Sequence, residues 1–226
     1  EGGWKIATTK GDFEARFVVN AAGVDAGKVH AMAAPENFVT RPCRGEYYLL
    51  DKSAGSTVGR VIFQCPTAAG KGVLVAPTVH GNLIVGPNAQ DVADSADTAT
   101  TAMGLAQVAQ SARKSVPGVD LSACIRNFAG IRANTDRPDF VIQWAAPGFL
   151  DLAGMKSPGL SAAAAVGEEA AALLQRAGLV LKEKENPVTT RKRIRFKELP
   201  GEEKAALIAR EPSYGRVICR CERVTE

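Results

Sequence analysis

The first twenty residues alternate between apolar and polar positions in the way that a β-hairpin does. The apolar positions of the second half of this stretch are Phe13, Ala15, Phe17 and Val19. A period of two places successive side chains on opposite faces of a sheet, and Lys10-Gly11 has the composition of a tight turn between two strands. The pattern therefore predicts strands over residues 4–9 and 12–20.

Short apolar runs separated by turn residues continue through the middle of the chain. These runs are residues 45–51, 60–66, 72–79 and 82–87, and strand-like stretches return at 124–135, 139–146 and 149–154. Because the connections between the middle runs are short and rich in turn residues, we expect these strands to form an antiparallel sheet.

Two longer stretches have apolar residues at helical spacing instead. The first covers residues 95–114, with Asp94 or Ser95 placed to cap its start and basic residues at its end. The second covers residues 157–178, where a Pro-Gly turn opens the helix and Gly178 closes it. A charged linker then leads to a short helix over residues 200–211. The sequence as a whole predicts an α+β fold in which a mixed, mainly antiparallel sheet is flanked by helices.

Composition narrows the class of protein. The chain has 226 residues, of which 46% are hydrophobic and 23% charged, so one large or two small domains are expected. No apolar run is long enough to span a bilayer, and the N-terminus has no signal-peptide pattern. Five cysteines without framework spacing favour a reducing compartment. We therefore expect a cytoplasmic protein that is not transmembrane. A first residue other than Met, inside a hairpin, favours a fragment of a longer chain.

The net charge of +4 is concentrated near the C-terminus. Residues 181–226 carry 12 Lys or Arg against 8 Asp or Glu, and the basic excess lies chiefly in the stretch 189–197. Recognition of nucleic acid would need aromatic residues among the basic ones, and only Phe196 is available there. We expect a solvated basic linker or edge strand, and no nucleic-acid partner.

The stretch GMKSPGLSAAAA, residues 154–165, is a candidate ligand site. A strand runs into a tight turn and then into a helix of very small residues. The N-terminus of such a helix presents free N–H groups and a positive dipole end, and small side chains leave room for a flat, bulky group. The stretch NAAG, residues 20–23, also consists of residues that permit close backbone approach. An ordinary strand–turn–helix junction is the alternative.

Four stretches, taken in order, resemble one family of flavoproteins. They are FVVNAAGVDAGKV (17–29), RGEYYLL (44–50), NFAGIRANT (127–135) and GMKSPGLSAAAAVGEEAA (154–171). Together they resemble the second half of a FAD-dependent oxidoreductase of the D-amino-acid-oxidase superfamily, in the branch of glycerol-3-phosphate dehydrogenases and L-2-hydroxyglutarate oxidases. The resemblance covers residues 1 to about 180. It implies that a hydride passes from a small 2-hydroxy anion, sn-glycerol 3-phosphate being the first guess, to bound FAD.

The resemblance also divides the chain. The implied parts are the remainder of a FAD-binding domain (1–38), an antiparallel-sheet substrate domain (39–144), the flavin-facing loop and helix of the FAD-binding domain (145–180), and a basic linker followed by the start of another domain (181–226). The cofactor-binding residues it implies are Ala21, Ala22, Gly23, Gly154, Met155, Lys156, Ser157, Pro158, Gly159 and Leu160. The phosphate-binding G-x-G-x-x-G motif of the family is absent. We therefore expect the chain alone to hold no FAD and to be inactive.

Three residues match positions that contact substrate or flavin in the family. Tyr47 matches a substrate-facing His or Tyr; because neighbouring strand residues face opposite ways, only Tyr47 or Tyr48 can do this, and core packing is the alternative. Arg132 matches an arginine that binds the phosphate or carboxylate of the substrate through a bidentate contact, the alternative being a surface salt bridge. Lys156 matches a lysine that would stabilise negative charge on the reduced flavin, the alternative being a solvated turn residue. His80 is expected to be a turn residue.

The chain closes with YGRVICRCERVTE, which contains Cys219 and Cys221. This segment resembles the opening of a bacterioferritin-associated-ferredoxin-like [2Fe-2S] domain, whose first two ligands form a C-x-C pair and whose other two lie further along the chain. A chance C-x-C pair is the alternative. Two thiolates cannot complete a four-cysteine cluster, so a [2Fe-2S] cluster is expected only in a longer protein.

Electrons would leave through that domain, a partner protein or a quinone. Two other functions remain open: an amine or amino-acid oxidase of the same fold, and a non-catalytic electron-transfer or scaffold subunit. Cations directed at the flavin position would favour an enzyme, whereas Arg132 and Lys156 directed into solvent would favour a scaffold.

Overall fold

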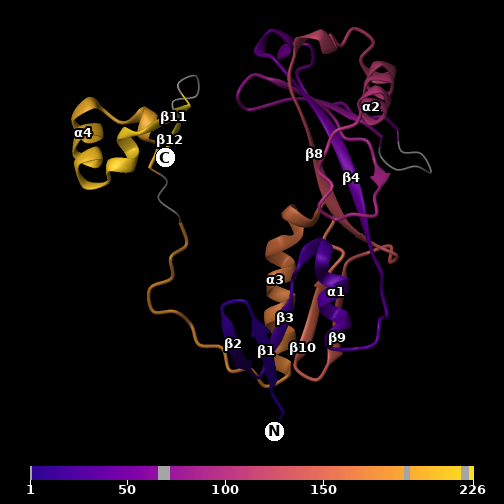
Figure 1. The fold of residues 1–226 in the computed structure, drawn as a ribbon, viewed down its shortest axis with the longest axis vertical. Coiled ribbons are helices and arrows are strands. Elements are labelled where there is room, and N and C mark those ends of the chain that lie inside the picture. Colours follow the sequence, from indigo (N-terminus) through magenta and orange to yellow (C-terminus); the bar gives the residue numbers. More distant parts are fainter. Residues whose placement is uncertain (1, 66–71, 191–193, 220–223) are drawn as a thin grey trace. The chain divides into compact units, whose positions relative to one another are not determined.

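The computed structural model describes residues 2–65, 72–190, 194–219 and 224–226, which form two compact units (Figure 1). The first unit extends to Val180 and the second runs from Leu181 to Glu226. No helix in these ranges is both long and apolar enough to cross a membrane.

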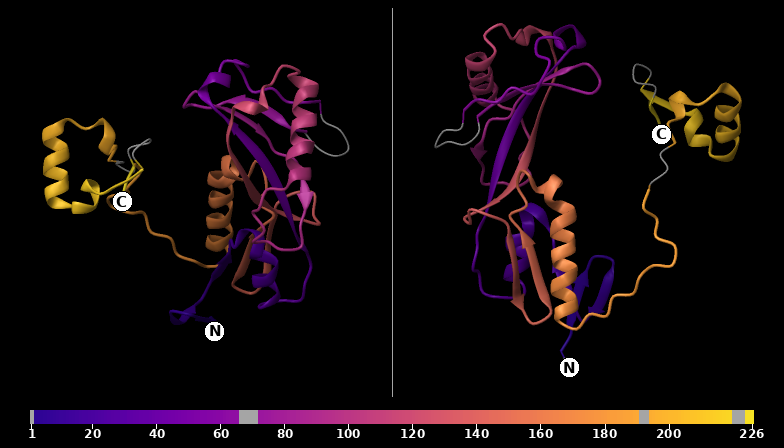
Figure 2. Two further views of the ribbon diagram at one scale, coloured as in Figure 1. Left: turned by 45° about the horizontal axis from the view of Figure 1, so that its top comes forward. Right: turned by 180° about the vertical axis from the view of Figure 1, so that it is seen from behind.

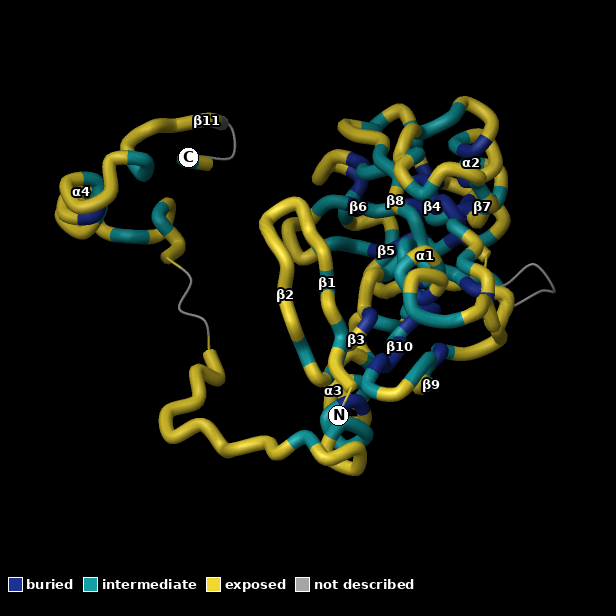
Figure 3. The backbone as a smooth tube through the Cα atoms, turned by 60° about the horizontal axis from the view of Figure 1, so that its bottom comes forward, coloured by how far each residue is buried: buried dark blue, intermediate teal, exposed yellow. Residues whose placement is uncertain are grey.

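The chain begins with the predicted hairpin, but the second strand is shorter than expected. β1 (Trp4–Thr8) pairs antiparallel with β2 (Gly11–Ala15). β2 ends at Ala15, and a separate strand, β3 (Val18–Asn20), follows. β3 pairs in parallel with residues 149–151, far along the sequence. The prediction of one continuous strand over 12–20 is therefore wrong, and Phe13 and Val19, two of its apolar positions, are 56% and 41% exposed. Most of the hairpin is exposed in Figure 3.

A small three-stranded sheet has β10 (Phe149–Ala153) at its centre. β10 is antiparallel to β9 (Val141–Ala146) and parallel to β3, with Asn20 opposite Asp151. The helical elements of this region are η1 (Gly23–Asp25), α1 (Ala26–Ala31) and α3 (Gly159–Arg176). α3 follows β10 and runs beside this sheet (Figures 1 and 2). The predicted helix over 157–178 is thus confirmed apart from its ends.

The second sheet is the antiparallel one that the middle of the sequence predicts. Its strands are β4 (Thr40–Leu50), β5 (Leu74–Pro77), β6 (Leu83–Gly86), β7 (Gln90–Asp91) and β8 (Cys124–Thr135), in the order β5-β6-β4-β7, with β8 paired along the length of β4. The strand predicted over 60–66 is wrong for its described part, in which Ile62 forms an isolated bridge with Val75 and Cys65 is exposed. Two short 3-10 turns connect elements of this unit: η2 (Lys52–Ala54) follows β4, and η3 (Leu121–Ala123) precedes β8.

One face of this sheet packs against α2 (Ala102–Ser115), and the main apolar core lies there. Its buried members are Leu50, Ala54, Val73, Val75, Leu83, Val85, Val108, Ala112 and Val119. The helix starts later than predicted because Thr101 is the N-cap, its Oγ1 accepting a hydrogen bond from the N–H of Gly104. Glu46, fully buried on β4, accepts hydrogen bonds from both the N–H and the hydroxyl of Thr101 at 2.7 and 3.0 Å. Asp94 instead accepts from Ala96 in a turn, so the predicted cap is wrong.

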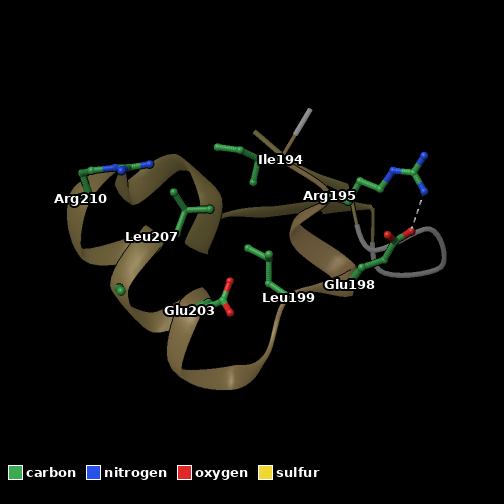
Figure 4. Close-up of a pocket in the computed structure, with 8 residues that line it drawn as sticks. Ile194, Arg195, Glu198, Leu199, Glu203, Leu207 and Arg210 are labelled. Atoms are coloured by element: carbon green, nitrogen blue, oxygen red, sulfur yellow. Dashed lines mark hydrogen bonds and ion pairs between the residues drawn. The ribbon is translucent and has the colours of Figure 1, made fainter. Parts of the chain in front are cut away.

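The C-terminal unit is small and lightly packed. It contains η4 (Phe196–Glu198), α4 (Gly201–Arg210), η5 (Pro212–Gly215), β11 (Val217–Cys219) and β12 (Val224–Thr225). This unit contains a cavity of about 630 Å³. Ile194, Leu199 and Leu207 line it, with charged residues around them (Figure 4). The predicted short helix over 200–211 is confirmed.

Candidate functional site

Both segments that were expected to contact a cofactor leave the same edge of the three-stranded sheet. β3 and β10 are parallel neighbours, so Asn20, the last residue of β3, lies beside Asp151, two residues before the carboxyl end of β10. The turn 20–23 follows the first strand, and the loop 154–159 follows the second. Ligands of α/β proteins bind outside the carboxyl ends of parallel strands, which makes this edge the candidate cofactor site.

The turn 20–23 is shaped by the side chain of Asn20. Its amide nitrogen donates to the carbonyl of Ala26 at 2.9 Å and to Oδ1 of Asp151 at 2.8 Å, and its carbonyl oxygen accepts from the N–H of Ala22 at 3.3 Å. Gly23 has φ +61°, a left-handed conformation that other residues rarely adopt. Ala21 and Ala22 are exposed, so small side chains line the open side of a fixed turn.

The loop 154–159 opens directly against the larger sheet. Gly154 has φ +68°, and a Cβ there would lie 3.2 Å from Oγ1 of Thr135, the last residue of β8. At the other end of the loop, the N-cap of α3 is Pro158, which provides no side-chain hydrogen bond, and Leu160 is 94% exposed. Helix N–H groups without a side-chain cap, beside small residues, fit the electron-rich edge of a flavin ring. The sequence has no G-x-G-x-x-G motif that could bind the pyrophosphate of FAD. The candidate site at this sheet edge therefore suits the ring end of FAD and not its pyrophosphate.

Arg132 lies on the face of the larger sheet opposite α2. Along β4 and β8 the paired residues are Cys43 with Arg132, Gly45 with Gly130 and Tyr47 with Phe128, and paired residues share a face. The guanidinium of Arg132 donates to the carbonyl of Asn88 at 3.0 Å and to Sγ of Cys43 at 3.5 Å. Its Nη2 lies so close to Gly45 that a Cβ there would be 2.6 Å away.

The guanidinium of Arg132 has N–H donors that its two contacts do not use. A guanidinium carries five N–H donors, and the contacts to Asn88 and Cys43 use two. No ion pair joins it to a carboxylate in the part of the chain that the structure describes, in contrast to Arg44 on the opposite face, which pairs with Asp97 at 2.6 Å and Glu46 at 3.4 Å. The alternative of a surface salt bridge for Arg132 therefore finds no support.

The two neighbouring tyrosines face opposite ways. The ring of Tyr47 stacks on that of Phe128, with centroids 4.9 Å apart and planes 7° apart, on the face that carries Arg132. Tyr48 packs against the apolar core under α2, and burial raises the pKa of its phenol. Tyr47 is therefore the tyrosine that shares a face with Arg132.

The structure does not bring all three predicted residues into mutual contact. Lys156 is half-exposed on its loop, and among the described residues no hydrogen bond or ion pair joins its side chain to Arg132 or Tyr47. Gly154, at the start of the same loop, lies beside Thr135, three residues beyond Arg132 on β8. His80 is an exposed residue of the turn that joins β5 to β6, as expected.

Sequence reasoning missed a buried polar cluster at the same sheet edge. His30, Asp151 and Asn20 are 0%, 0% and 3% exposed, and Nδ1 of His30 lies 2.6 Å from Oδ2 of Asp151. The one sequence signal was a carboxylate at residue 151 within the apolar strand FLDLAG. Buried charged groups are rarely found without partners, so that signal pointed to an interior ion pair.

The terminal cysteines fall at the limit of the described chain. Cys219 ends β11, whereas Cys221 lies outside the described residues. Within the described ranges, no group of three or more His, Cys, Asp or Glu side chains could hold a metal ion.

Comparison with protein families matches residues 1–173 to the family described as FAD dependent oxidoreductase (DAO). This range covers the N-terminal hairpin, the three-stranded sheet and the larger antiparallel sheet, and it ends within α3.

Three known proteins show marked similarity. A glycerol 3-phosphate dehydrogenase of Caloramator mitchellensis is 44% identical over 227 residues, covering 99% of this chain and 47% of that protein. A glycerol 3-phosphate oxidase of Mycoplasma genitalium is 35% identical, covering 79% of this chain and 47% of that protein. The solved structure of a dithionite-reduced L-alpha-glycerophosphate oxidase from Mycoplasma pneumoniae with FAD bound is 32% identical with a TM-score of 0.68, over 79% of this chain and 47% of that one. The chain thus spans about half the length of the relatives it matches.

Proposed function

The chain belongs to the family of FAD dependent oxidoreductases, and from this premise we propose that the whole protein oxidises glycerol 3-phosphate. Both curated relatives named above carry names that refer to this substrate, as does the solved structure. Oxidation of this 2-hydroxy anion removes a hydride from C2 and a proton from its hydroxyl group. FAD, when bound, supplies the two-electron acceptor for that hydride.

The observation that carries the proposal is the state of Arg132. Its guanidinium is fixed by the Asn88 carbonyl, Cys43 and the bare backbone of Gly45, yet it has no carboxylate partner among the described residues. Fixed donors without a counter-ion suit an anion that arrives with the substrate, and an arginine binds phosphate through two parallel hydrogen bonds. In this account Arg132 binds the phosphate and orients the glycerol.

Tyr47 and Lys156 take the other roles. Tyr47 lies on the same sheet face as Arg132, one register step beyond Gly45, where its phenol can hydrogen-bond to the substrate. Lys156 lies on the loop that begins beside Thr135, and its ammonium group would stabilise negative charge on the reduced ring. Both roles depend on the family resemblance together with the position of these side chains.

The cofactor contacts follow from the shared edge of β3 and β10. We assign the ring end of FAD to the turn Ala21, Ala22 and Gly23 and to the loop Gly154, Met155, Lys156, Ser157, Pro158, Gly159 and Leu160. The support is the shape of the turn, the uncapped start of α3 and the exposure of both segments. The pyrophosphate would be bound elsewhere in the whole protein.

The domain organisation remains part of the proposal. Residues 1–38 and 145–180 would belong to the FAD-binding domain, and residues 39–144 to the substrate domain. β9 (Val141–Ala146) spans the proposed boundary between residues 144 and 145, and it pairs with β10 of the FAD-binding part. A boundary near residue 140 therefore agrees better with the strand pairing. Residues 181–226 would be a linker and the start of a further domain, which agrees with a family match that ends at residue 173.

We also infer that Cys219 and Cys221 belong to a [2Fe-2S] domain of the whole protein. One support is the C-x-C spacing. The other is that the dehydrogenase aligns with 99% of this chain, whereas the two oxidases align with only 79% of it, so the C-terminal segment is an addition that not all relatives share. Two thiolates are half of a four-cysteine set, so this chain alone does not fit the cluster, and no electron-transfer step is assigned to it. We likewise propose that the electron acceptor is an iron–sulfur domain, a partner protein or a quinone, and that the whole protein is cytoplasmic.

A substrate panel tests the proposed function. Purified whole protein should turn over sn-glycerol 3-phosphate with a higher kcat/KM than L-2-hydroxyglutarate, glycine or proline, with an artificial electron acceptor. Faster oxidation of an amine would support the amino-acid-oxidase alternative. No turnover of any compound, with FAD bound, would support the scaffold alternative.

A further inference from the structure

His30 has an oxygen acceptor at each ring nitrogen. Nδ1 lies 2.6 Å from Oδ2 of Asp151, and Nε2 lies 2.9 Å from the carbonyl oxygen of Pro35. A neutral imidazole has one N–H and can donate a hydrogen bond to only one of these two oxygens. For both contacts to be hydrogen bonds, the pair of His30 and Asp151 must hold one additional proton. The side chains of His30 and Asp151 are fully buried, so no solvent replaces a lost contact.

This buried pair connects the two segments of the candidate cofactor site. Oδ1 of Asp151 accepts from Asn20, whose own carbonyl oxygen holds the N–H of Ala22 in the turn 20–23. Asp151 also lies three residues before Gly154, where the flavin-facing loop begins. One hydrogen-bonded chain therefore runs from α1 through β10 and β3 to the turn 20–23.

We propose that His30 is a positioning residue for FAD binding: its extra proton fixes Asp151 and Asn20, and through them the turn 20–23 and the loop 154–160, so that binding of FAD is accompanied by uptake of a proton. The inference rests on the proposed function, because it takes the cofactor and the two segments from there. His30 itself touches neither segment and acts through Asp151.

The charged groups around His30 agree with this assignment. Asp151 faces it from β10 and Glu36 from the segment after α1; the uncharged neighbours are the Pro35 carbonyl and the ring of Phe38, 4.9 Å away. Burial lowers the pKa of His30, but the hydrogen bonds to Pro35 and Asp151 and the charge of Asp151 outweigh it, so the pKa is raised. Above that pKa the ring can satisfy only one of its two acceptors.

Loss of the proton should therefore reduce the population of the arrangement that binds FAD. The apparent dissociation constant rises as the competent fraction falls. Because linkage is reciprocal, bound FAD must also raise the proton occupancy of the pair. A merely structural histidine would make no such connection between proton and cofactor.

The test is calorimetric titration of FAD into the whole protein after its own flavin has been removed. Titrations in buffers of different ionisation enthalpy give the number of protons taken up. At pH values around and above the raised pKa of His30, the wild type should take up a fraction of a proton on binding FAD, and its Kd for FAD should rise at least about threefold as the pH increases through that pKa. His30→Gln should abolish both effects. His80→Gln is the matched control, because this exposed turn residue should leave both unchanged.

Each outcome decides the matter. FAD binding by the wild type without proton uptake would overturn this inference alone, as would unchanged proton uptake in His30→Gln. Absence of FAD binding at every pH would overturn the proposed function as well. If His30→Gln does not fold, Asp151→Asn takes its place, because an amide cannot share the extra proton; proton uptake by this variant equal to that of the wild type would again overturn the inference.

Discussion

The guanidinium of Arg132 lies against Gly45, so closely that a Cβ at residue 45 would stand 2.6 Å from Nη2 and 2.8 Å from Cβ of Pro87. Gly130, the register partner of Gly45 on β8, would carry a Cβ with no atom within 4 Å. One glycine of the pair thus makes room for the candidate substrate-binding arginine, and the other does not.

Gly45→Ala should displace the Arg132 guanidinium and weaken binding of the substrate phosphate. We expect a loss of about 1–3 kcal/mol in the free energy of unfolding, as is usual when a methyl group is added to a well-packed interior. The KM for glycerol 3-phosphate should rise at least about tenfold, with a smaller change in kcat, because orientation of an anion-binding group is lost. Urea unfolding and steady-state kinetics on the whole protein measure the two effects.

Gly130→Ala is the control for stability. Its free energy of unfolding should stay within about 0.5 kcal/mol of the wild type, since the added methyl group meets nothing. Wild-type stability and KM in Gly45→Ala would show that the contact between Gly45 and Arg132 is unimportant.

Arg132→Ala should remove the contact to the substrate anion without loss of flavin. Loss of a charge-assisted contact costs about 2–5 kcal/mol, so kcat/KM for glycerol 3-phosphate should fall by about two orders of magnitude or more. The ratio of bound flavin to protein should not change. Arg126→Ala, an exposed arginine on the same strand, should behave as the wild type. Equal kcat/KM for Arg132→Ala and Arg126→Ala would make Arg132 a structural residue.

The paired variants Tyr47→Phe and Tyr48→Phe separate the two faces of β4. Tyr47 shares its face with Arg132, so removing its hydroxyl group should lower kcat/KM by about tenfold, the effect of one hydrogen bond to substrate. Tyr48 packs against the core, so Tyr48→Phe should leave kcat/KM unchanged. A larger kinetic effect for Tyr48→Phe would reverse the assignment of the faces.

The stability of the protein should fall as the pH rises through the pKa of His30. This pKa is raised in the folded state, so the stabilisation is complete below 6.5, the value of the unfolded chain, and is lost as the pH passes the higher folded value. The slope for one proton is at most about 1.4 kcal/mol per pH unit. Urea unfolding of the wild type and His30→Gln over this pH range should show the slope in the wild type alone; parallel curves would show that another group titrates.

In the whole protein, Cys219→Ser and Cys221→Ser should each lower the iron content while the flavin content stays constant. A four-cysteine cluster cannot form when one ligand is lost, and the proposed FAD-binding segments lie elsewhere in the chain. Cys124→Ser, a half-exposed cysteine of the first unit, serves as control. Unchanged iron in both terminal variants would leave the C-x-C pair without a metal role.

Elements with an uninterrupted pattern could be predicted from the sequence almost to the residue. The strand 124–135 and the helix over 157–178 are examples, because local periodicity determines them. The fate of residues 16–20 could not be predicted: β3 pairs in parallel with β10, and the Asn20–Asp151 hydrogen bond joins residues 131 positions apart. The carboxylate of Asp151 within an apolar strand indicates a buried partner, but the local sequence does not identify Asn20 as that partner.

The candidate site shows the same division. Arg132 and Tyr47 were found through the resemblance of short motifs, and the alternation of β4 placed one tyrosine opposite the other. The groups that hold Arg132 were not foreseen, because the Asn88 carbonyl lies 44 positions away and the role of Gly45 depends on a side chain from another strand. The late start of α2 has a similar cause, since its cap is bound by Glu46 from 55 positions away.

Anaerobic titration of the whole, FAD-loaded protein with sn-glycerol 3-phosphate tests the central claim most directly. The account predicts that this compound bleaches the visible absorption band of the oxidised flavin completely in wild type, and that Arg132→Ala requires a far higher concentration for the same bleaching. A flavin band that persists with excess glycerol 3-phosphate but is bleached by an amino acid or another amine would contradict it.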